Sequence, residues 1–248
     1  MDTGLEGKVA IVTGGSGGIG LASARALAAE GARIVLGDLD AEAVAGAASE
    51  LGSGIATAIV ADVAQPDGAQ TLVDTALERF GRLDVLVASA GIYRATRLDA
   101  ITAEEWDLVL AVNLRGVFLT AQAALRVFAP QRSGRIIALG SVAGQVGGLA
   151  ASAAYASSKG GVIALTKSLA RYSGPYGVTA NCVNPGIIDS PMTAGWPPDD
   201  LARLRAAAPL GRSGTVAEVA AVVAFLASDA ASFVHGAHID VNGGLLMD

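Results

Sequence analysis

Cysteine is nearly absent from this sequence of 248 residues, which contains only Cys182. An internal disulfide is therefore excluded, and the composition fits a reducing compartment. Cys182 lies within the predicted strand 178–183, so we interpret it as a buried strand residue rather than a reactive thiol.

Charged residues are also scarce, at 16% of the chain, and they give a net charge of −6 without a basic run. This balance argues against nucleic acid as a partner. The hydrophobic share of 52% predicts a well-buried core rather than disorder. Apolar runs such as 219–227 are too short to cross a bilayer, and residues 1–7 lack the features of a signal peptide. We therefore expect a cytoplasmic protein with no membrane partner.

Metal-ligand clusters and domain boundaries are missing as well. His235 and His238 do not lie with other ligand types at metal-binding spacing, so we expect them to pack or cap and expect no metal site. No linker, low-complexity tract or break in composition interrupts the chain. Residues 1–248 are therefore predicted to form a single dinucleotide-binding and catalytic domain.

What the sequence does contain is glycine, at 32 residues, and a regular alternation of apolar strands and helices. Short turns between such units predict an α/β fold, a doubly wound parallel sheet of the Rossmann type with helices on both faces. The predicted strands cover residues 8–13, 33–37, 55–60, 83–87, 134–140, 178–183 and 237–241. The predicted helices cover residues 21–30, 41–51, 67–80, 103–128, the segment around Tyr155 to about 172, and 201–207.

The first predicted strand runs directly into the glycine-rich turn 14–20 and then into a helix. Glycines let such a turn approach a pyrophosphate closely, and the helix N-terminus attracts its negative charge. The order of strand, turn and helix is the context that this motif needs. The turn therefore predicts a dinucleotide site.

Asp38 ends the second predicted strand, close to the spacing at which an acidic residue accepts hydrogen bonds from an adenosine ribose. Such charge-assisted bonds contribute about 1.5–3 kcal/mol each. A 2′-phosphate would meet Asp38 as a like charge, and no Arg or Lys occurs between Gly14 and Gly20. We therefore expect NAD (NADH) rather than NADP. Asp40 is a weaker candidate, since it fits better as the N-cap of the next helix.

Tyr155 and Lys159 lie four residues apart, on one face of a predicted helix. A lysine ammonium one turn away is expected to lower the tyrosine pKa from about 10 by roughly three units, about 4 kcal/mol, so that the phenol can act as a base. Taken alone, this pair is a weak pattern, and a surface Tyr–Lys contact is the better interpretation of it. The catalytic interpretation is favoured because six polar or glycine-rich stretches fall at strand carboxyl ends, where ligands of parallel sheets bind. These stretches are 14–20, Asp38, Asp62, 88–91, Ser141 and 184–186.

Together these residues resemble the short-chain dehydrogenase/reductase family over essentially the whole chain. The matching residues are Thr13-Gly14-x-x-x-Gly18-Ile19-Gly20, Asp62-Val63, Ala90-Gly91, Asn113, Ser141, Tyr155-x-x-x-Lys159 and Pro185-Gly186. The resemblance implies that Tyr155 is the general acid/base and that Ser141 polarises the substrate oxygen. It implies that Lys159 binds the nicotinamide ribose and that Asn113 holds a water relaying protons to Lys159. It also implies a homotetramer in which the Tyr155 and Asn113 helices pack against a neighbour.

The cofactor contacts follow from the same resemblance. Asp62 would meet the adenine, and Ile188 would bind the nicotinamide carboxamide through its backbone. Ser190 stands where the family usually has a threonine. The cofactor-binding residues expected are Gly14, Ser16, Gly17, Gly18, Ile19, Gly20, Asp38, Leu39, Asp62, Val63, Ala90, Gly91, Tyr155, Lys159, Pro185, Gly186, Ile188 and Ser190.

Two features depart from the family's usual pattern. Ala88-Ser89 replaces a pair that usually contains asparagine, which puts the sheet-bracing or cofactor-orienting role of that side chain in doubt. The interval from Ser141 to Tyr155 is about one residue longer than in many members. We place the extra residue in the loop 147–151, on the substrate side.

Residues 187–209 are predicted to form a substrate lid, long and irregular enough to move. The lining suggested by the sequence is mostly apolar and lacks a cationic anchor, since Arg94 and Arg97 are expected to be solvated. Phosphorylated or carboxylated substrates are therefore disfavoured. The substrate-binding candidates are Ile92, Tyr93, Leu149, Ala151, Ser152, Met192 and Trp196, with Ser141 and Tyr155 at the reacting oxygen.

We expect an NAD-dependent alcohol dehydrogenase or ketone reductase that interconverts a secondary alcohol and a ketone. A 3-oxoacyl-thioester reductase of the same family, acting on acyl carrier protein or CoA, is the alternative. A cofactor-binding sensor or scaffold is disfavoured by the intact Ser141, Tyr155 and Lys159. An enoyl-type reductase is also disfavoured, because that branch usually places six residues between its tyrosine and lysine.

Overall fold

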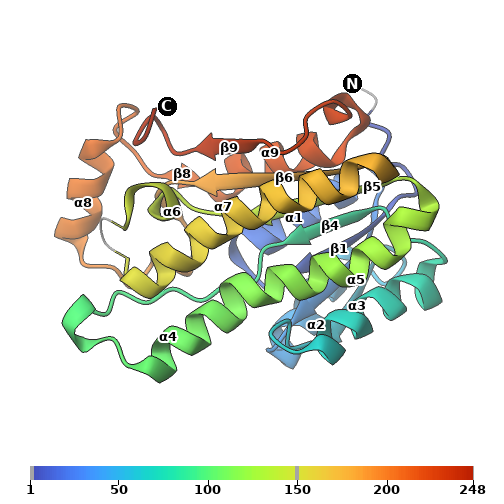
Figure 1. The fold of residues 1–248 in the computed structure, drawn as a ribbon, viewed down its shortest axis with the longest axis horizontal. Helices are drawn as coiled ribbons and strands as arrows, with labels where there is room; N and C mark the ends of the chain where they lie inside the picture. Colours follow the sequence, from blue (N-terminus) through green and yellow to red (C-terminus); the bar gives the residue numbers. More distant parts are fainter. Residues whose placement is uncertain (1–2, 149–150, 248) are drawn as a thin grey trace.

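The computed structural model describes residues 3–148 and 151–247. Within them the chain forms a parallel seven-stranded sheet in the order β3-β2-β1-β4-β5-β6-β9 (Figure 1). The order reverses direction between β1 and β4, which is where open α/β sheets leave a crevice for ligands. The strands are β1 (Val9–Thr13), β2 (Arg33–Asp38), β3 (Ala56–Val60), β4 (Val85–Ala88), β5 (Gly134–Leu139), β6 (Val178–Pro185) and β9 (His238–Val241).

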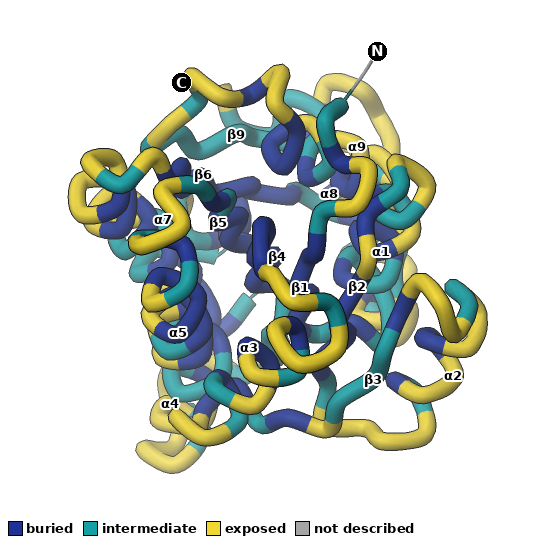
Figure 2. Tube along the Cα trace, turned by 90° about the vertical axis from the view of Figure 1, so that its right-hand side faces the viewer, coloured by how far each residue is buried: buried dark blue, intermediate teal, exposed yellow. Residues whose placement is uncertain are grey.

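Helices cover both faces of the sheet, as predicted (Figure 2). On one face α3 (Pro66–Phe80), α5 (Gly116–Gln131) and α7 (Ala153–Ser173) enclose a core with Val9 and Ile11 of β1. On the other face α1 (Gly18–Ala29), α2 (Ala41–Leu51) and α9 (Val216–Ala227) enclose a core with Ala10 and Val12. Successive β1 side chains thus enter opposite cores, which explains why residues 9–12 of this strand are all apolar.

The predicted helix 103–128 differs from the structure in one respect. It consists of α4 (Ala103–Leu110), a π-helical turn η2 (Ala111–Arg115) and α5, in continuous succession. The stretch Ala103–Gln131 is long and apolar enough to span a membrane by composition alone, but half of its most apolar window is buried. Phe128 and Ala124 of α5 lie in the core against the sheet, so we interpret it as a core helix.

The C-terminal third contains elements that the sequence patterns do not predict. Helix α9 begins with a capping box formed by Thr215 and Glu218. Strands β7 (Ile188–Asp189) and β8 (Gly214–Thr215) pair as a small second sheet. Between them in the chain lies α8 (Pro198–Ala207), which was predicted over residues 201–207, at the end of the molecule that also holds α4 (Figure 1). The remaining short helices are α6 (Ala143–Val146), η1 (Leu98–Ala100), η3 (Gly174–Tyr176) and η4 (Asp229–Ala231).

Candidate active site

The glycine turn between β1 and α1 has the shape that a pyrophosphate site requires. A Cβ atom on Gly20 would overlap the carbonyl oxygen of Gly14, so the helix can approach the turn this closely only with glycine. Gly18 has a φ of +54°, and a Cβ on Gly17 or Gly18 would meet nothing within 4 Å. Open space therefore lies at the N-terminus of α1, where backbone N–H groups attract an anion. The cradle fits a dinucleotide.

Asp38 lies at the rim of this cradle, at the carboxyl end of β2. Its Oδ2 accepts hydrogen bonds from the Ser16 hydroxyl at 2.6 Å and from the Ser16 N–H at 3.1 Å. Its Oδ1 accepts one from the N–H of Leu39 at 2.8 Å. The carboxylate is thereby fixed in direction, and Oδ1, which accepts one hydrogen bond, keeps a lone pair for a ribose hydroxyl. Asp40, in contrast, caps α2 as predicted by accepting from the N–H groups of Glu42 and Ala43.

Ser141 and Tyr155 come from two elements that meet above β5. Ser141 follows that strand, is 8% exposed, and its Oγ accepts a hydrogen bond from the N–H of Ala143. Tyr155 lies in the first turn of α7, also 8% exposed, and hydrogen-bonds with Ser141 through its side chain. The two hydroxyls can therefore contact one substrate oxygen together.

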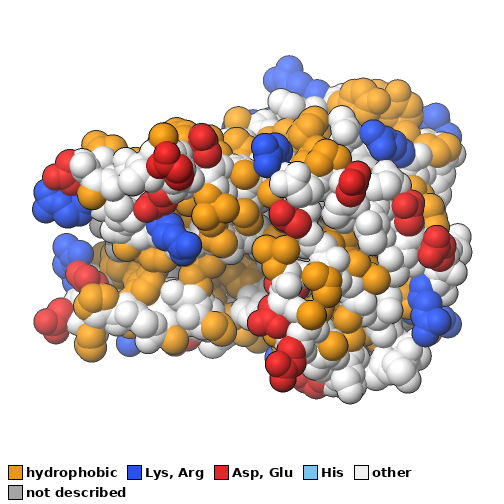
Figure 3. All heavy atoms as spheres, turned by 90° about the horizontal axis from the view of Figure 1, so that it is seen from below, with side chains coloured by type: hydrophobic (Ala, Val, Ile, Leu, Met, Phe, Trp, Pro, Cys, Tyr) orange, Lys and Arg blue, Asp and Glu red, His pale blue; other side chains and the backbone are white. Residues whose placement is uncertain are grey.

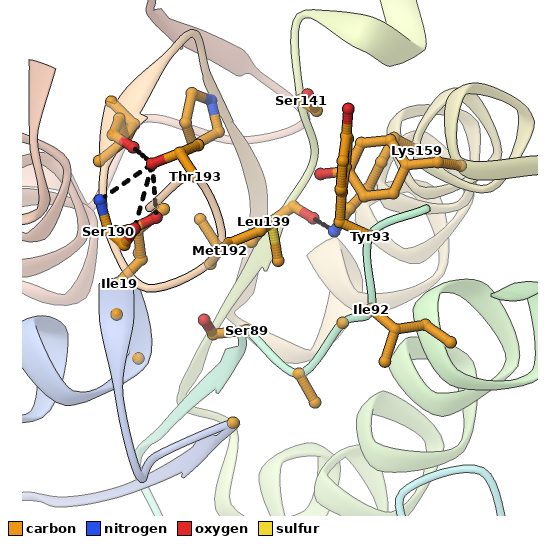
Figure 4. A pocket seen from close by; sticks show the side chains of 18 of the residues that line it. Ile19, Ser89, Ile92, Tyr93, Leu139, Ser141, Lys159, Ser190, Met192 and Thr193 are labelled. Atoms are coloured by element: carbon orange, nitrogen blue, oxygen red, sulfur yellow. Dashed lines mark hydrogen bonds between the residues drawn. The ribbon is translucent and has the colours of Figure 1, made fainter. Parts of the chain in front are cut away.

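Lys159 lies one turn after Tyr155 on α7, and its Nζ donates to the Leu139 carbonyl at 2.6 Å (Figure 4). The Nζ lies 5.8 Å from the centre of the Tyr155 ring. The side chain is buried, which lowers the pKa of Lys159 from 10.5 to about 8. Two of its three N–H donors remain for ligands.

The pKa of Tyr155 corrects our expectation. The sequence predicted that Lys159 would lower it, but burial raises the pKa of Tyr155 to about 12, and the hydrogen bond with Ser141 offsets only part of this rise. The reason is that both Tyr155 and Lys159 are desolvated, so the charged form of each is disfavoured. Without ligands, the phenol at neutral pH is a proton donor.

A cavity of about 400 Å³ joins the glycine turn to these hydroxyls along the carboxyl edge of the sheet. It is lined by every residue that we predicted to bind the cofactor, from Gly14 after β1 to Ser190 after β7. Among the predicted substrate residues, Ile92, Tyr93, Ala151, Met192 and Trp196 line it. In Figure 4, Ile92, Tyr93 and Lys159 lie on one side of the cavity, and Met192, Ser190 and Thr193 lie on the other.

Comparisons with known proteins agree with this site. The family model described as enoyl-(acyl carrier protein) reductase matches residues 14–246. The 3-oxoacyl-[acyl-carrier-protein] reductase FabG of Escherichia coli is 40% identical over 98% of this chain and 99% of its own. An uncharacterized oxidoreductase of Mycobacterium bovis is 40% identical over 97% of both chains. The crystal structure of gox2181 superposes with a TM-score of 0.93 at 38% identity, covering 97% of this chain and 96% of the other.

This chain belongs to the short-chain dehydrogenase/reductase family. It is accordingly an oxidoreductase, and the family's cofactors are nicotinamide dinucleotides. The fold, with its parallel sheet and helices on both faces, is the Rossmann-type architecture that the sequence predicted.

The departure at Ala88-Ser89 has a structural explanation in this family member. Ala88 is buried at the end of β4 within the core, where a larger amide side chain would need space. The turn that follows is braced by Thr13 of β1, whose Oγ1 accepts from the N–H groups of Ser89 and Ala90, both at 3.1 Å. The backbone of this turn, which lines the cavity, can thus still contact a cofactor without the usual asparagine.

Asn113 does not line the cavity; its side chain is fully buried within the π-helical turn. Its Oδ1 accepts from the Ile92 N–H at 2.8 Å, and its Nδ2 donates to the Ile92 carbonyl and to the Ser158 hydroxyl. The side chain therefore ties the segment after β4 to α7. The proton relay that we predicted for Asn113 remains a hypothesis, since both amide hydrogens are already donated to protein atoms.

Ser152 also differs from the prediction. It is 2% exposed and caps α7 by accepting a hydrogen bond from the N–H of Tyr155, so it positions the catalytic helix and does not line the cavity. Leu149 lies outside the described residues. The exposed Arg97 pairs with Asp99, and the exposed Arg94 donates to the Tyr93 carbonyl, which agrees with solvated roles for both arginines.

Some lining residues were not anticipated, and Thr193 is the clearest example. Its hydroxyl donates to the Ile188 carbonyl at 2.7 Å and accepts from the N–H of Ser190, so it folds the segment after β7 over the cavity. Ser190 could be predicted from its position in the family pattern, whereas Thr193 belongs to no motif. Val142, Val146, Leu204 and Leu245 also line the cavity.

His235 and Cys182 pack in the protein as predicted, whereas the buried Nδ1 of His238 has no hydrogen-bond partner among the described residues. His235 Nδ1 accepts from the N–H of Ala180, and its Nε2 bonds with the Ala170 carbonyl, so the ring packs between β6 and α7. Cys182 is buried in β6. No group of three or more potential metal-ligating side chains occurs in residues 3–148 and 151–247.

Proposed function

We propose that this protein is an NAD(H)-dependent oxidoreductase that interconverts a secondary alcohol and a ketone. The observation that carries the proposal is the single cavity that Ser141, Tyr155 and Lys159 line together with the glycine turn and Asp38. The dinucleotide, when bound, supplies or accepts a hydride at its nicotinamide ring. Tyr155 donates a proton to the carbonyl oxygen in reduction and takes it back in oxidation, so the ketone gains one hydride and one proton. Ser141 holds that oxygen.

The preference for NAD rests on Asp38. Its carboxylate is held at the ribose end by Ser16 and Leu39. Among the described residues that line the cavity, Lys159 is the only basic one, and it lies at the Tyr155 end. A 2′-phosphate near Asp38 would therefore meet a like charge without a compensating cation.

A 3-oxoacyl-thioester reductase is the second candidate. Relatives named 3-oxoacyl-[acyl-carrier-protein] reductase are 40% identical in Escherichia coli and 41% identical in Synechocystis, and both span nearly the whole chain. An acidic carrier protein would need basic residues near the cavity. The face shown in Figure 3 carries interspersed acidic and basic side chains and a hollow with hydrophobic side chains, without a concentrated basic patch. We therefore rank the free ketone first.

The enoyl reductase named by the family model is not the function that we propose. That branch usually places six residues between tyrosine and lysine, whereas Tyr155 and Lys159 have three between them.

We further propose a cytoplasmic homotetramer without membrane or nucleic-acid partners. The exposed apolar side chains Leu108 of α4 and Phe118 of α5 support association through the helices next to the Asn113 turn. The segment 187–209 is proposed to move as a lid.

A spectrophotometric screen tests the proposal. Secondary alcohols, ketones and a 3-oxoacyl thioester are each assayed with NAD(H) and NADP(H) at the absorbance of the reduced nicotinamide. We expect turnover of ketones with NADH. Turnover restricted to the thioester would favour the second candidate, and a preference for NADPH would refute the cofactor assignment.

A further inference from the structure

Three aromatic rings lie in succession beside the reacting hydroxyl. Tyr93, from the segment after β4, contacts the Tyr155 ring edge to face, with centroids 5.3 Å apart and planes at 71°. On its other side Tyr93 packs against Trp196, with centroids 4.9 Å apart and planes at 31°. Both Tyr93 and Trp196 line the cavity. An aromatic wall, defined here as Tyr93 and Trp196, therefore begins at the catalytic phenol and continues into the segment over the cavity.

Trp196 is held in this wall by its ring contacts. Its indole N–H is buried and has no hydrogen-bond partner among the described residues. Its backbone N–H donates to the Thr193 carbonyl, and Thr193 is itself fixed to Ile188. The turn thus sets where the indole lies, while Tyr93 supplies the surface on which it rests. The indole of Trp196 thus makes ring contacts while its N–H stays unpaired, and such a ring is suited to contact an aromatic ligand.

The other side chains around this part of the cavity are aliphatic. Ile92, Val142, Val146, Ala151 and Met192 line it. Val146 is 40% exposed and Met192 is 45% exposed, so apolar surface continues to the opening of the cavity. Among the described lining residues, the carboxylates Asp38 and Asp62 lie at the carboxyl ends of β2 and β3. The Lys159 ammonium lies beside Tyr155 and donates to the Leu139 carbonyl. Neither side chain of the wall carries a charge, and the carboxylate of Asp200 acts on Tyr93, so an anionic substituent is disfavoured there.

We propose that the substrate is a neutral aryl ketone, or the corresponding secondary aryl alcohol, whose ring packs against the Tyr93–Trp196 wall. This inference rests on the proposed function and names its substrate class. With the carbonyl oxygen between Ser141 and Tyr155, a substituent ring attached to the carbonyl carbon lies beside the first ring of the wall, Tyr93. The reaction is the same transfer of one hydride and one proton.

The test compares two neutral methyl ketones, 1-phenylethanone and 2-butanone, in the full-length protein with NADH. We expect kcat/KM to be at least about tenfold higher for the aryl ketone, which corresponds to about 1.4 kcal/mol. In Trp196→Ala the value for 1-phenylethanone should fall about tenfold, while that for 2-butanone should change less than about threefold. Trp196→Phe should restore most of the loss, because it restores an aromatic face.

Phe233→Ala is the matched control, since it removes an aromatic side chain that is fully exposed and does not line the cavity. It should leave both kcat/KM values unchanged. Thermal unfolding of each variant shows whether its fold is kept. Equal kcat/KM for the two ketones, or an equal loss for both in Trp196→Ala, would overturn this inference and leave the proposed function standing. Absence of turnover of any ketone with either cofactor would instead overturn the proposed function, and this inference with it.

Discussion

The buried side chain of Lys159 should make the free energy of unfolding depend measurably on pH. Burial lowers its pKa from 10.5 to about 8 in the folded protein. Between these values the unfolded chain binds more protons at this residue than the folded chain does, so the free energy of unfolding rises with pH. From the two pKa values, the lowered pKa of Lys159 reduces the free energy of unfolding by about 3.4 kcal/mol at pH 7 and by about 1.4 kcal/mol at pH 9.5.

Lys159→Met isolates this contribution, because methionine fills similar space without a charge. The Leu139 carbonyl loses its donor in the variant at both pH values, so that loss cancels in the comparison. Urea unfolding of both proteins at pH 7 and pH 9.5, at one protein concentration, should show the wild type gaining about 2 kcal/mol relative to the variant. If the difference in free energy of unfolding between the two proteins is the same at both pH values, the lowered pKa of Lys159 is refuted.

Three further outcomes are expected. Tyr155→Phe should lower kcat by about 10²–10⁴-fold while cofactor binding, followed by fluorescence titration, persists; near-normal kcat would contradict its role as acid and base. Asp38→Ala should raise the ratio of NADP to NAD use in steady-state assays, and Ser16→Ala should do so to a smaller degree; unchanged ratios in both would count against the ribose contact. Gly20→Ala should weaken cofactor binding at least about tenfold, because the new Cβ has no space, whereas Gly46→Ala, with open space around it, should not; equal binding in both would disprove the cradle.

The cofactor half of the site could be predicted from sequence because its residues follow directly from local order. Strand, glycine turn and helix determine where Gly14 to Gly20 lie, and parallel strands bring Asp38 and Asp62 to the same edge. The alternation of apolar strands with helices is equally local, which is why the parallel sheet was predicted with small errors at strand ends.

The parts that could not be predicted depend on burial and on contacts between distant segments. The pKa of Tyr155 rises because of desolvation, which the spacing to Lys159 does not reveal. Ser152 looks like a lining residue in the sequence, yet its hydroxyl is used by the helix that it caps. Thr193 belongs to no motif. Helix α9 is apolar on most sides, so its sequence lacks the periodicity from which a helix is predicted.

The buried amide of Asn113 stands in for a peptide group. By accepting from the N–H of Ile92 and donating to its carbonyl, it gives that residue both of the hydrogen bonds that a neighbouring strand would offer. The backbone of Ile92, which lines the cavity, is thus held by the Asn113 side chain rather than by a neighbouring strand. Two contacts after Ile92 also join this segment to the catalytic helix: the Tyr93 ring packs on Tyr155, and the Arg94 carbonyl accepts from the N–H of Ser152, the N-cap of α7. A change in the position of Ile92 would therefore be passed on to the reacting phenol.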